Sequence, residues 1–247
     1  MGRSFSVVAA VIGFLACTTH TQDVTAQRGG SGIIVGHVRL TGPAQANPLI
    51  RFGADPLCSK INRGQRHVQE YVLRADDGGL ANVFVDVQGT FPATPAPSSA
   101  VTIDQRGCIY APRVVGLQVG QTLQITNSDP ILHNLHSLSA KGNEFNVSQP
   151  KAGMVFKFQA KAPEEMVRLK CDVHSWMTAW IGVRSHPHFA VTSAEGAFRI
   201  QGVPPGRYTL RTWHERFGVM TQPVTVTPGQ TSTVDFSYTG KEKPPAT

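Results

Sequence analysis

Short strand-like runs separated by glycine- and proline-rich turns extend along most of this chain. Its 247 residues include 24 Gly and 17 Pro, and turn signals such as Pro204-Pro205-Gly206 stand between runs of branched and aromatic residues. Turns at this frequency do not allow long helices, and short strands at this spacing favour antiparallel sandwiches. We therefore predict an all-β fold, with strands at 33–40, 83–88, 101–104, 123–126, 155–159, 167–170, 179–183, 208–212 and 232–237.

One short segment carries a thiol, an imidazole and a thioether. Cys171, His174 and Met177 lie within seven residues, and His133 lies 38 residues before the cysteine, after a strand-like run. Two imidazoles and a thiolate with a weak thioether suit copper, because sulfur donors favour Cu(I) and imidazoles accept either oxidation state. Structural zinc normally takes four strong N or S ligands, and a thioether is a poor one. The set therefore predicts copper rather than zinc.

This ligand pattern resembles the small blue copper proteins, the cupredoxins. The loop from Cys171 to Met177 has a spacing most similar to that of amicyanin, and Gly116–Asn127 resembles the strand pair before the first ligand. The resemblance covers roughly residues 106–186. It implies a Greek-key β-sandwich that holds one type 1 copper ion.

The same resemblance assigns roles to individual residues. It implies that the strong ligands are His133, Cys171 and His174, and that Met177 is the weak axial ligand. It also implies that Asn134, which follows the first ligand, ties the two ligand loops together and donates toward the Cys171 sulfur.

A second resemblance follows the copper region. The run Gly196–Leu210, with its Pro204-Pro205-Gly206 turn, resembles the carboxypeptidase-regulatory-like modules, which are small prealbumin-like β-sandwiches. Residues 187–240 are short for a free-standing sandwich, so they are expected to borrow strands from the N-terminal part. The predicted organisation is a signal peptide at 1–26, an N-terminal β-rich region at 27–105, a copper domain at 106–186, a regulatory-like module at 187–240 and a disordered tail at 241–247.

The N-terminus resembles an export signal. Arg3 precedes an apolar run over residues 5–16, and Val24-Thr25-Ala26 offers a small-residue cleavage site before Gln27. A competing interpretation is a lipoprotein box that ends at Cys17, which would leave the protein anchored by lipid. Both interpretations predict an exported protein, periplasmic or extracellular.

The cysteines fit an oxidising compartment. Without Cys17, three remain, and Cys58 and Cys108 are plausible disulfide partners, with two buried free thiols as the alternative. Copper ligation would then explain why Cys171 stays unpaired.

Other histidines make a weaker case for chemistry. His136 occupies a strand position that should face away from His133, which favours a packing or surface role over a ligand role. Adjacent strand residues point to opposite faces, so His214 and Glu215 are poorly placed as an acid–base pair. The motif His186-Pro187-His188 lies in an apparent linker, where a second metal site competes with simple packing.

These observations predict a one-electron carrier rather than an enzyme, since familiar catalytic motifs are missing from the sequence. The resemblance to the cupredoxins implies that His174 is the more exposed ligand and the electron port, around which Trp176 and Ile131 would form an apolar docking rim. The alternative is a cell-envelope binding or scaffold protein with structural, stored or no copper. A subunit of a respiratory or photosynthetic complex would combine the two.

The charge adds an expectation about partners. The formal net charge is +7, which would steer an acidic redox partner or allow peripheral association with anionic lipid. The basic residues are scattered along the sequence rather than clustered, which argues against nucleic-acid binding.

Overall fold

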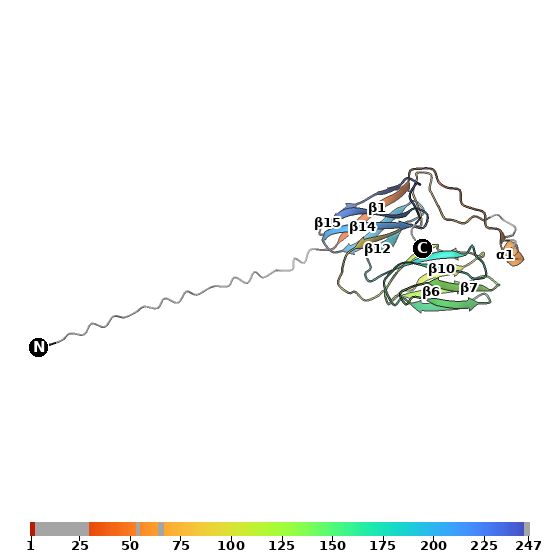
Figure 1. Cartoon of the computed structure of the whole chain (residues 1–247), viewed down its shortest axis with the longest axis horizontal. Coiled ribbons are helices and arrows are strands. Elements are labelled where there is room, and N and C mark those ends of the chain that lie inside the picture. Colours follow the sequence, from red (N-terminus) through yellow and green to blue (C-terminus); the bar gives the residue numbers. More distant parts are fainter. Residues whose placement is uncertain (3–29, 53–54, 64–66, 245–247) are drawn as a thin grey trace.

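The computed structural model describes residues 1–2, 30–52, 55–63 and 67–244. The rest of the expected signal peptide, the alternative lipid anchor Cys17 and the last three residues of the expected tail lie outside the described residues. Four sheets build two sandwiches, and the described residues contain one helix, α1 (Pro56–Ile61) (Figure 1). The predicted all-β fold is confirmed. No helix in the described part of the chain has the length and apolar character to cross a membrane.

The first sandwich contains residues 101–184 and consists of two sheets. One sheet has the order β5 (Val114–Gln118), β11 (Thr178–Arg184), β10 (Glu164–Lys170), β7 (His133–Leu138) and β8 (Phe145–Gln149). The other has the order β4 (Tyr110–Ala111), β3 (Val101–Gln105), β6 (Thr122–Asn127) and β9 (Val155–Gln159). We call this first sandwich the metal sandwich, because it carries the predicted ligands.

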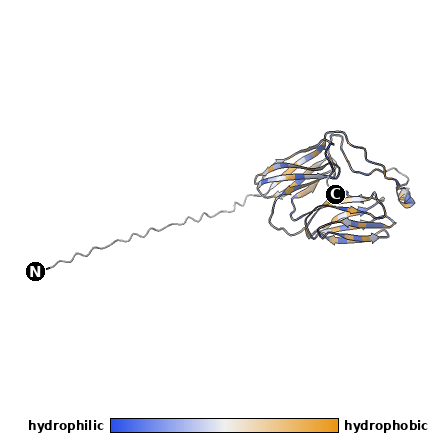
Figure 2. Cartoon of the chain, viewed as in Figure 1, coloured by the Kyte–Doolittle hydropathy of each residue, from blue (hydrophilic) through white to orange (hydrophobic). Residues whose placement is uncertain are grey.

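Apolar residues alternate along the strands of the metal sandwich, so that one face of each sheet packs into a shared core (Figure 2). In β6, for example, Leu123 and Ile125 are buried while their neighbours are partly exposed. The pairs β3–β6 and β5–β11 run parallel, which differs from the purely antiparallel expectation. Their connections cross between the two sheets, as in a Greek-key arrangement.

The second sandwich combines strands from both ends of the chain. One sheet has the order β13 (Ala197–Val203), β1 (Gly32–Leu40) and β16 (Thr231–Thr233), and β17 (Phe236–Tyr238) also pairs with β1. The other has the order β12 (Phe189–Val191), β2 (Phe84–Gln88), β14 (Gly206–His214) and β15 (Gly218–Val226). The expected borrowing of N-terminal strands is therefore present. Residues 27–105 do not form a unit of their own, and the metal sandwich begins at Val101 instead of 106.

The two sandwiches contact each other through an aromatic and charged seam. The Phe84 ring lies against Gly182, where an added Cβ would come within 2.6 Å of a ring carbon. Arg113 of the first sandwich pairs with Glu215 of the second, and both side chains are at most 10% exposed. Removing one partner of such a buried pair would leave the other charge buried and uncompensated, which is strongly destabilising.

A long connection between β1 and β2 reaches the far end of the metal sandwich. This segment, residues 41–83, is called the cap here; it carries α1 over the end of the sandwich at which β7 begins (Figure 1). Its two arms meet in an antiparallel bridge between Leu49 and Val68. The cap thus brings residues of the N-terminal region to the predicted metal ligands.

Candidate metal centre

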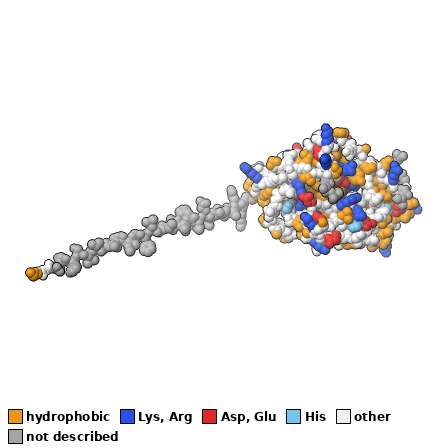
Figure 3. Space-filling model, viewed as in Figure 1, with side chains coloured by type: hydrophobic (Ala, Val, Ile, Leu, Met, Phe, Trp, Pro, Cys, Tyr) orange, Lys and Arg blue, Asp and Glu red, His pale blue; other side chains and the backbone are white. Residues whose placement is uncertain are grey.

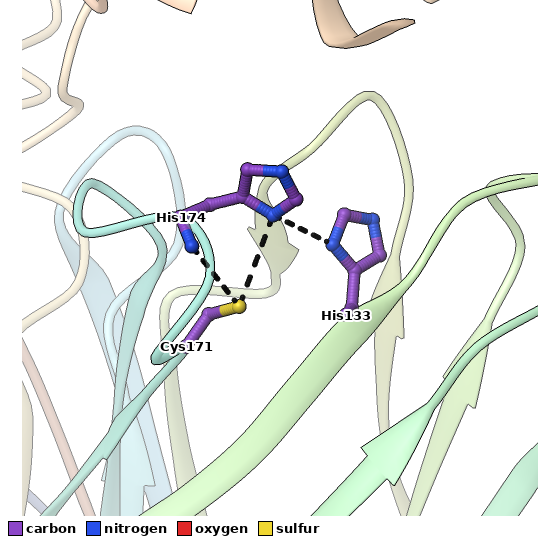
Figure 4. A group of neighbouring side chains, drawn as sticks. All are labelled: His133, Cys171 and His174. Atoms are coloured by element: carbon purple, nitrogen blue, oxygen red, sulfur yellow. Dashed lines mark hydrogen bonds between the residues drawn. The ribbon is translucent and has the colours of Figure 1, made fainter. Parts of the chain in front are cut away.

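Three of the predicted ligands converge at one end of the metal sandwich. His133 is the first residue of β7, while Cys171 and His174 lie in the turn between β10 and β11 (Figure 4). The two Nδ1 atoms are 3.1 Å apart, and the Cys171 Sγ lies 3.8 Å from Nδ1 of His174. All three side chains are buried, and their donor atoms lie within 4.8 Å of one another.

Backbone N–H groups surround the sulfur. The amides of Asn134 and His174 both donate to Cys171 Sγ at 3.4 Å. The Asn134 side chain accepts a hydrogen bond from the Asp172 amide at 3.1 Å, so it links the two ligand loops as the sequence predicted. The donation toward sulfur comes from the Asn134 backbone, whereas its side-chain amide donates to Asn146.

This environment favours the thiolate form of Cys171. Burial by itself would raise the pKa of the thiol, but hydrogen bonds from His133, His174 and the two backbone amides outweigh it. The pKa is lowered to about 6. A thiolate is the form of cysteine that binds a metal ion.

The outward-facing nitrogens of both imidazoles are held by carboxylates. Nε2 of His133 lies 2.9 Å from Asp129 Oδ2, and Nε2 of His174 lies 3.0 Å from Asp55 Oδ2. Burial lowers the pKa of both histidines, but the carboxylates and the Cys171 sulfur outweigh it, and both pKa values are raised. Such outer carboxylates orient the ring and direct its other nitrogen toward the metal position.

Sequence reasoning missed both carboxylates. Asp129 lies four residues before His133, a spacing that could have been noticed. Asp55 lies 119 residues from His174 in the sequence, and no local pattern connects the two.

The cap covers His174. This side chain is 1% exposed, so it is not the exposed ligand that was predicted, and its role as the electron port stays a prediction. The N-cap residue of α1 is Asp55, and the next turn carries Cys58, whose sulfur lies 3.5 Å from Nε2 of His174. Cys58 is joined to Cys108 by the predicted disulfide.

The cap also packs against the predicted docking rim, in which Ile131 is buried and Trp176 is partly buried. Trp176 packs edge-to-face against Phe52 of the cap, with ring centroids 5.5 Å apart, and its Nε1 donates to the Cys108 carbonyl at 2.8 Å. Ile131 is buried in a small apolar cluster with Ile50 and Phe52. Sequence could not reveal this, because the covering segment comes from a distant part of the chain.

Met177, the predicted axial ligand, lies in the same loop between β10 and β11 as Cys171 and His174. Its side chain is buried in the apolar core that also contains Cys171. Its amide donates to the His174 carbonyl at 2.9 Å, and its carbonyl accepts from the Cys171 amide at 3.3 Å. The ligand loop is thereby closed on itself, and the axial role of the thioether stays a prediction.

The other histidine motifs lie away from this centre. His136 bonds Asp172 at the surface, at 2.8 Å, so it does not face the donors. His186 and His188 stack on each other in the second sandwich. His214 is fully buried, while the Glu215 carboxylate pairs with Arg113.

The donor set fits copper chemically. Two imidazole Nδ1 atoms and one thiolate sulfur point at a common position, and the opposite nitrogens are already satisfied by carboxylates. A set of two imidazoles and one thiolate is typical of copper sites that exchange electrons.

Residues 181–239 match the family model of the carboxypeptidase regulatory-like domain. A search of curated protein sequences found no match.

Among solved structures, the chain is similar to three kinds of copper protein. A purple cupredoxin from Nitrosopumilus maritimus shares 21% identity, with a TM-score of 0.30, over 34% of this chain and 98% of that one. A Cu(I) form of a variant amicyanin shares 17% identity, with a TM-score of 0.31, over 40% of this chain and 98% of that one. A copper-containing nitrite reductase from Thermus scotoductus SA-01 shares 20% identity, with a TM-score of 0.31, over 39% of this chain but only 25% of that one. The chain is thus an all-β protein in which residues 181–239 match the carboxypeptidase regulatory-like domain.

Proposed function

We propose that this chain is an exported copper protein with one type 1 centre that carries single electrons. The observation that carries the proposal is the convergence of His133 Nδ1, His174 Nδ1 and the Cys171 sulfur in a buried position. Met177 would be the weak fourth ligand. When bound, copper would supply a one-electron couple between Cu(II) and Cu(I).

The protein's own residues would keep the site ready for both oxidation states. Backbone amides neutralise part of the thiolate charge on Cys171, and carboxylates hold both imidazoles in place. Little ligand movement is then needed when the charge of the site changes. Burial of the donors excludes water, which would otherwise compete for the metal position.

One observation favours a second candidate function. The cap buries His174, so the ring edge that would form the shortest path to a partner is covered. A closed site of this kind also suits an envelope binding or scaffold protein in which copper is structural or stored. The carboxypeptidase regulatory-like domain would then dock the protein to a larger assembly.

Charge supports an acidic redox partner or an anionic lipid surface for either function. The net charge is +7, and Lys and Arg side chains are spread over the visible face of the molecule without one dense patch (Figure 3). Spread charges of one sign attract a partner over distance but do not by themselves define a docking site.

The experiment that tests the copper centre is a titration of the mature protein with Cu(II), followed by visible absorption and EPR spectra. We expect an intense thiolate-to-copper band that saturates at one equivalent and is missing in Cys171→Ser. His136→Ala is the matched control, because its side chain lies outside the donor cluster, and it should keep the band. Absence of the band in the unsubstituted protein would refute the copper proposal.

Reduction kinetics then separate the two functions. An electron carrier should be reduced and reoxidised reversibly by small redox reagents without losing copper. A storage or scaffold protein should exchange electrons slowly or release the metal on reduction.

A further inference from the structure

Each of the two imidazoles of the candidate copper centre lies within hydrogen-bond distance of a carboxylate, and the two carboxylates come from different parts of the chain. We call each of these carboxylate–imidazole contacts a clamp. Asp129 belongs to the metal sandwich and lies in the segment between β6 and β7, four residues before its histidine. Asp55 belongs to the cap, and the sequence separation to its histidine is 119 residues. One of the two carboxylates, Asp55, therefore comes from outside the metal sandwich.

We propose that Asp55 is a positioning residue of the metal centre. It holds His174 with the proton on Nε2 and the lone pair of Nδ1 directed at the common donor position. This proposal rests on the proposed copper function for its consequence, although the clamp itself can be tested without metal.

A single carboxylate fixes both the helix and the imidazole. Oδ1 of Asp55 accepts the amide of Leu57 at 2.8 Å, which caps the N-terminus of α1. Oδ2 of the same group lies 3.0 Å from Nε2 of His174. The position of α1 is thereby linked to the orientation of the ring.

The disulfide connects the two clamps. Cys58 follows Asp55 by three residues and is bonded to Cys108. The Cys108 amide in turn donates to Asp129 Oδ2 at 2.8 Å, the oxygen that also faces His133. A continuous chain of bonds thus runs from one imidazole, through the cap and the disulfide, to the other.

Further contacts keep the cap in place. Asn62 Nδ2 donates to the Gly107 carbonyl at 3.0 Å, and Gln69 Nε2 donates to the Trp176 carbonyl at 2.9 Å. These bonds reach the loops on both sides of the donor cluster. Asp55 is therefore held at the ring by more than its own hydrogen bond.

Loss of the clamp would have a direct chemical consequence. His174 is 1% exposed and the Asp55 side chain is 26% exposed, so without Asp55 the Nε2–H loses its fixed, charged acceptor and faces only mobile water and the Cys58 sulfur at 3.5 Å. The ring would gain by rotating or by moving the proton to Nδ1, and either change removes a donor from the metal position. Removal of an outer partner of this kind typically lowers metal affinity by about 10- to 100-fold.

A purely structural role for Asp55 as helix cap predicts something different. Serine caps a helix about as well as aspartate, but its side chain is too short to reach the imidazole as well. Asp55→Ser should therefore keep α1 and remove the clamp. Asp55→Asn keeps the shape and an acceptor oxygen without the charge, so its effect should be intermediate. Asp77→Ser is the matched control, because among the described residues that carboxylate accepts only the Gly79 amide, in a turn of the cap.

The test has a metal-free and a metal-bound measurement. In the metal-free protein, nitrogen-15 NMR near neutral pH should show a protected Nε2–H on His174, and this signal should disappear in Asp55→Ser while it persists in Asp77→Ser. In Cu(II) competition titrations against a chelator, Asp55→Ser should bind about 10- to 100-fold more weakly, with Asp77→Ser unchanged.

The two measurements distinguish the positioning role of Asp55 from the proposed copper function. Unchanged copper affinity and an unchanged Nε2–H signal in Asp55→Ser would overturn the positioning role. If the unsubstituted protein takes up no copper, the proposed function fails, and the NMR signal alone then decides whether Asp55 clamps the ring.

Discussion

Histidines are buried in both sandwiches, but their partners differ. At the metal end, His133 and His174 each face a carboxylate with one nitrogen and the donor cluster with the other. In the second sandwich, His186 and His188 lie against Phe91, with ring centroids 4.6 and 4.5 Å from it, and His214 stacks on Phe217 at 4.8 Å.

The pKa values follow these partners. Burial lowers the pKa of His186 to about 4 and that of His214 to about 3. Carboxylates and the Cys171 sulfur raise the pKa of His133 and His174 in spite of burial. Burial together with neighbouring positive groups therefore makes a neutral core histidine, whereas an outer carboxylate prepares a ligand.

The largest expected effect is a loss of stability when the disulfide at the metal end is removed. The Cys58–Cys108 disulfide closes a sequence separation of 50 residues, and no disulfide lies in the second sandwich within the described residues. Replacing both cysteines with serine should lower the free energy of unfolding by about 4 kcal/mol, measured by urea denaturation. The same variant should expose the cap to limited proteolysis before either sandwich is cut. Simultaneous cleavage of cap and sandwiches would contradict a cap held separately by the disulfide.

The next effect tests the clamp inside the metal sandwich. Asp129→Ala leaves the amides of Gly107 and Cys108 and the Nε2 of His133 without their acceptor in a buried region. We expect a loss of about 3 kcal/mol in the free energy of unfolding of the metal-free protein. Asp77→Ala, which affects an exposed turn, serves as the control. A loss as small as that of the control would mean that the clamp contributes little to the fold.

A pH titration separates the two groups of histidines. His186 and His214 have pKa values below the unfolded value of about 6.5, so the unfolded chain binds protons that the folded chain does not. Their contribution to stability is complete above about pH 6.5 and is lost as the pH falls toward about 4 for His186 and about 3 for His214, by up to about 1.4 kcal/mol per pH unit for each histidine.

The non-titrating variant His214→Gln should reduce this slope, as measured by urea unfolding of the metal-free protein at a series of pH values. The raised pKa values of His133 and His174 act in the opposite direction, since their contribution is present at low pH and is lost as the pH rises. An identical slope in His214→Gln and the unsubstituted protein would contradict the assignment.

The smallest effect is expected for His136, a surface histidine that belongs to neither group of buried histidines. His136 is part of a surface pair with Asp172, in which the two side chains are 29% and 40% exposed. His136→Ala should change the free energy of unfolding by less than about 0.5 kcal/mol, and it should leave copper affinity unchanged. A clear loss of copper binding would show that the donor cluster extends beyond the three converging residues.

Much of the fold was predictable because strand signals are local. The predicted strand at 155–159 coincides with β9, and the one at 33–40 differs from β1 by one residue. The pairing of these strands was harder to predict. Strand β1 joins β13 from the other end of the chain, and that contact depends on long-range packing that periodicity does not encode.

The same distinction between local signals and long-range packing applies to the metal centre. His133, Cys171 and His174 could be proposed from spacing, since the ligand loop is short and the first imidazole begins a strand. The burial of His174 could not be proposed, because Asp55 and Cys58 arrive on the cap from 119 and 116 residues away.

X-ray absorption at the copper edge of the loaded, mature protein tests the central claim most directly. A centre made of His133, His174 and Cys171 predicts two nitrogen scatterers and one sulfur scatterer in the first shell, with the sulfur lost in Cys171→Ser. A first shell of nitrogen and oxygen alone, unchanged by Cys171→Ser, would contradict the claim that these converging residues form the copper site.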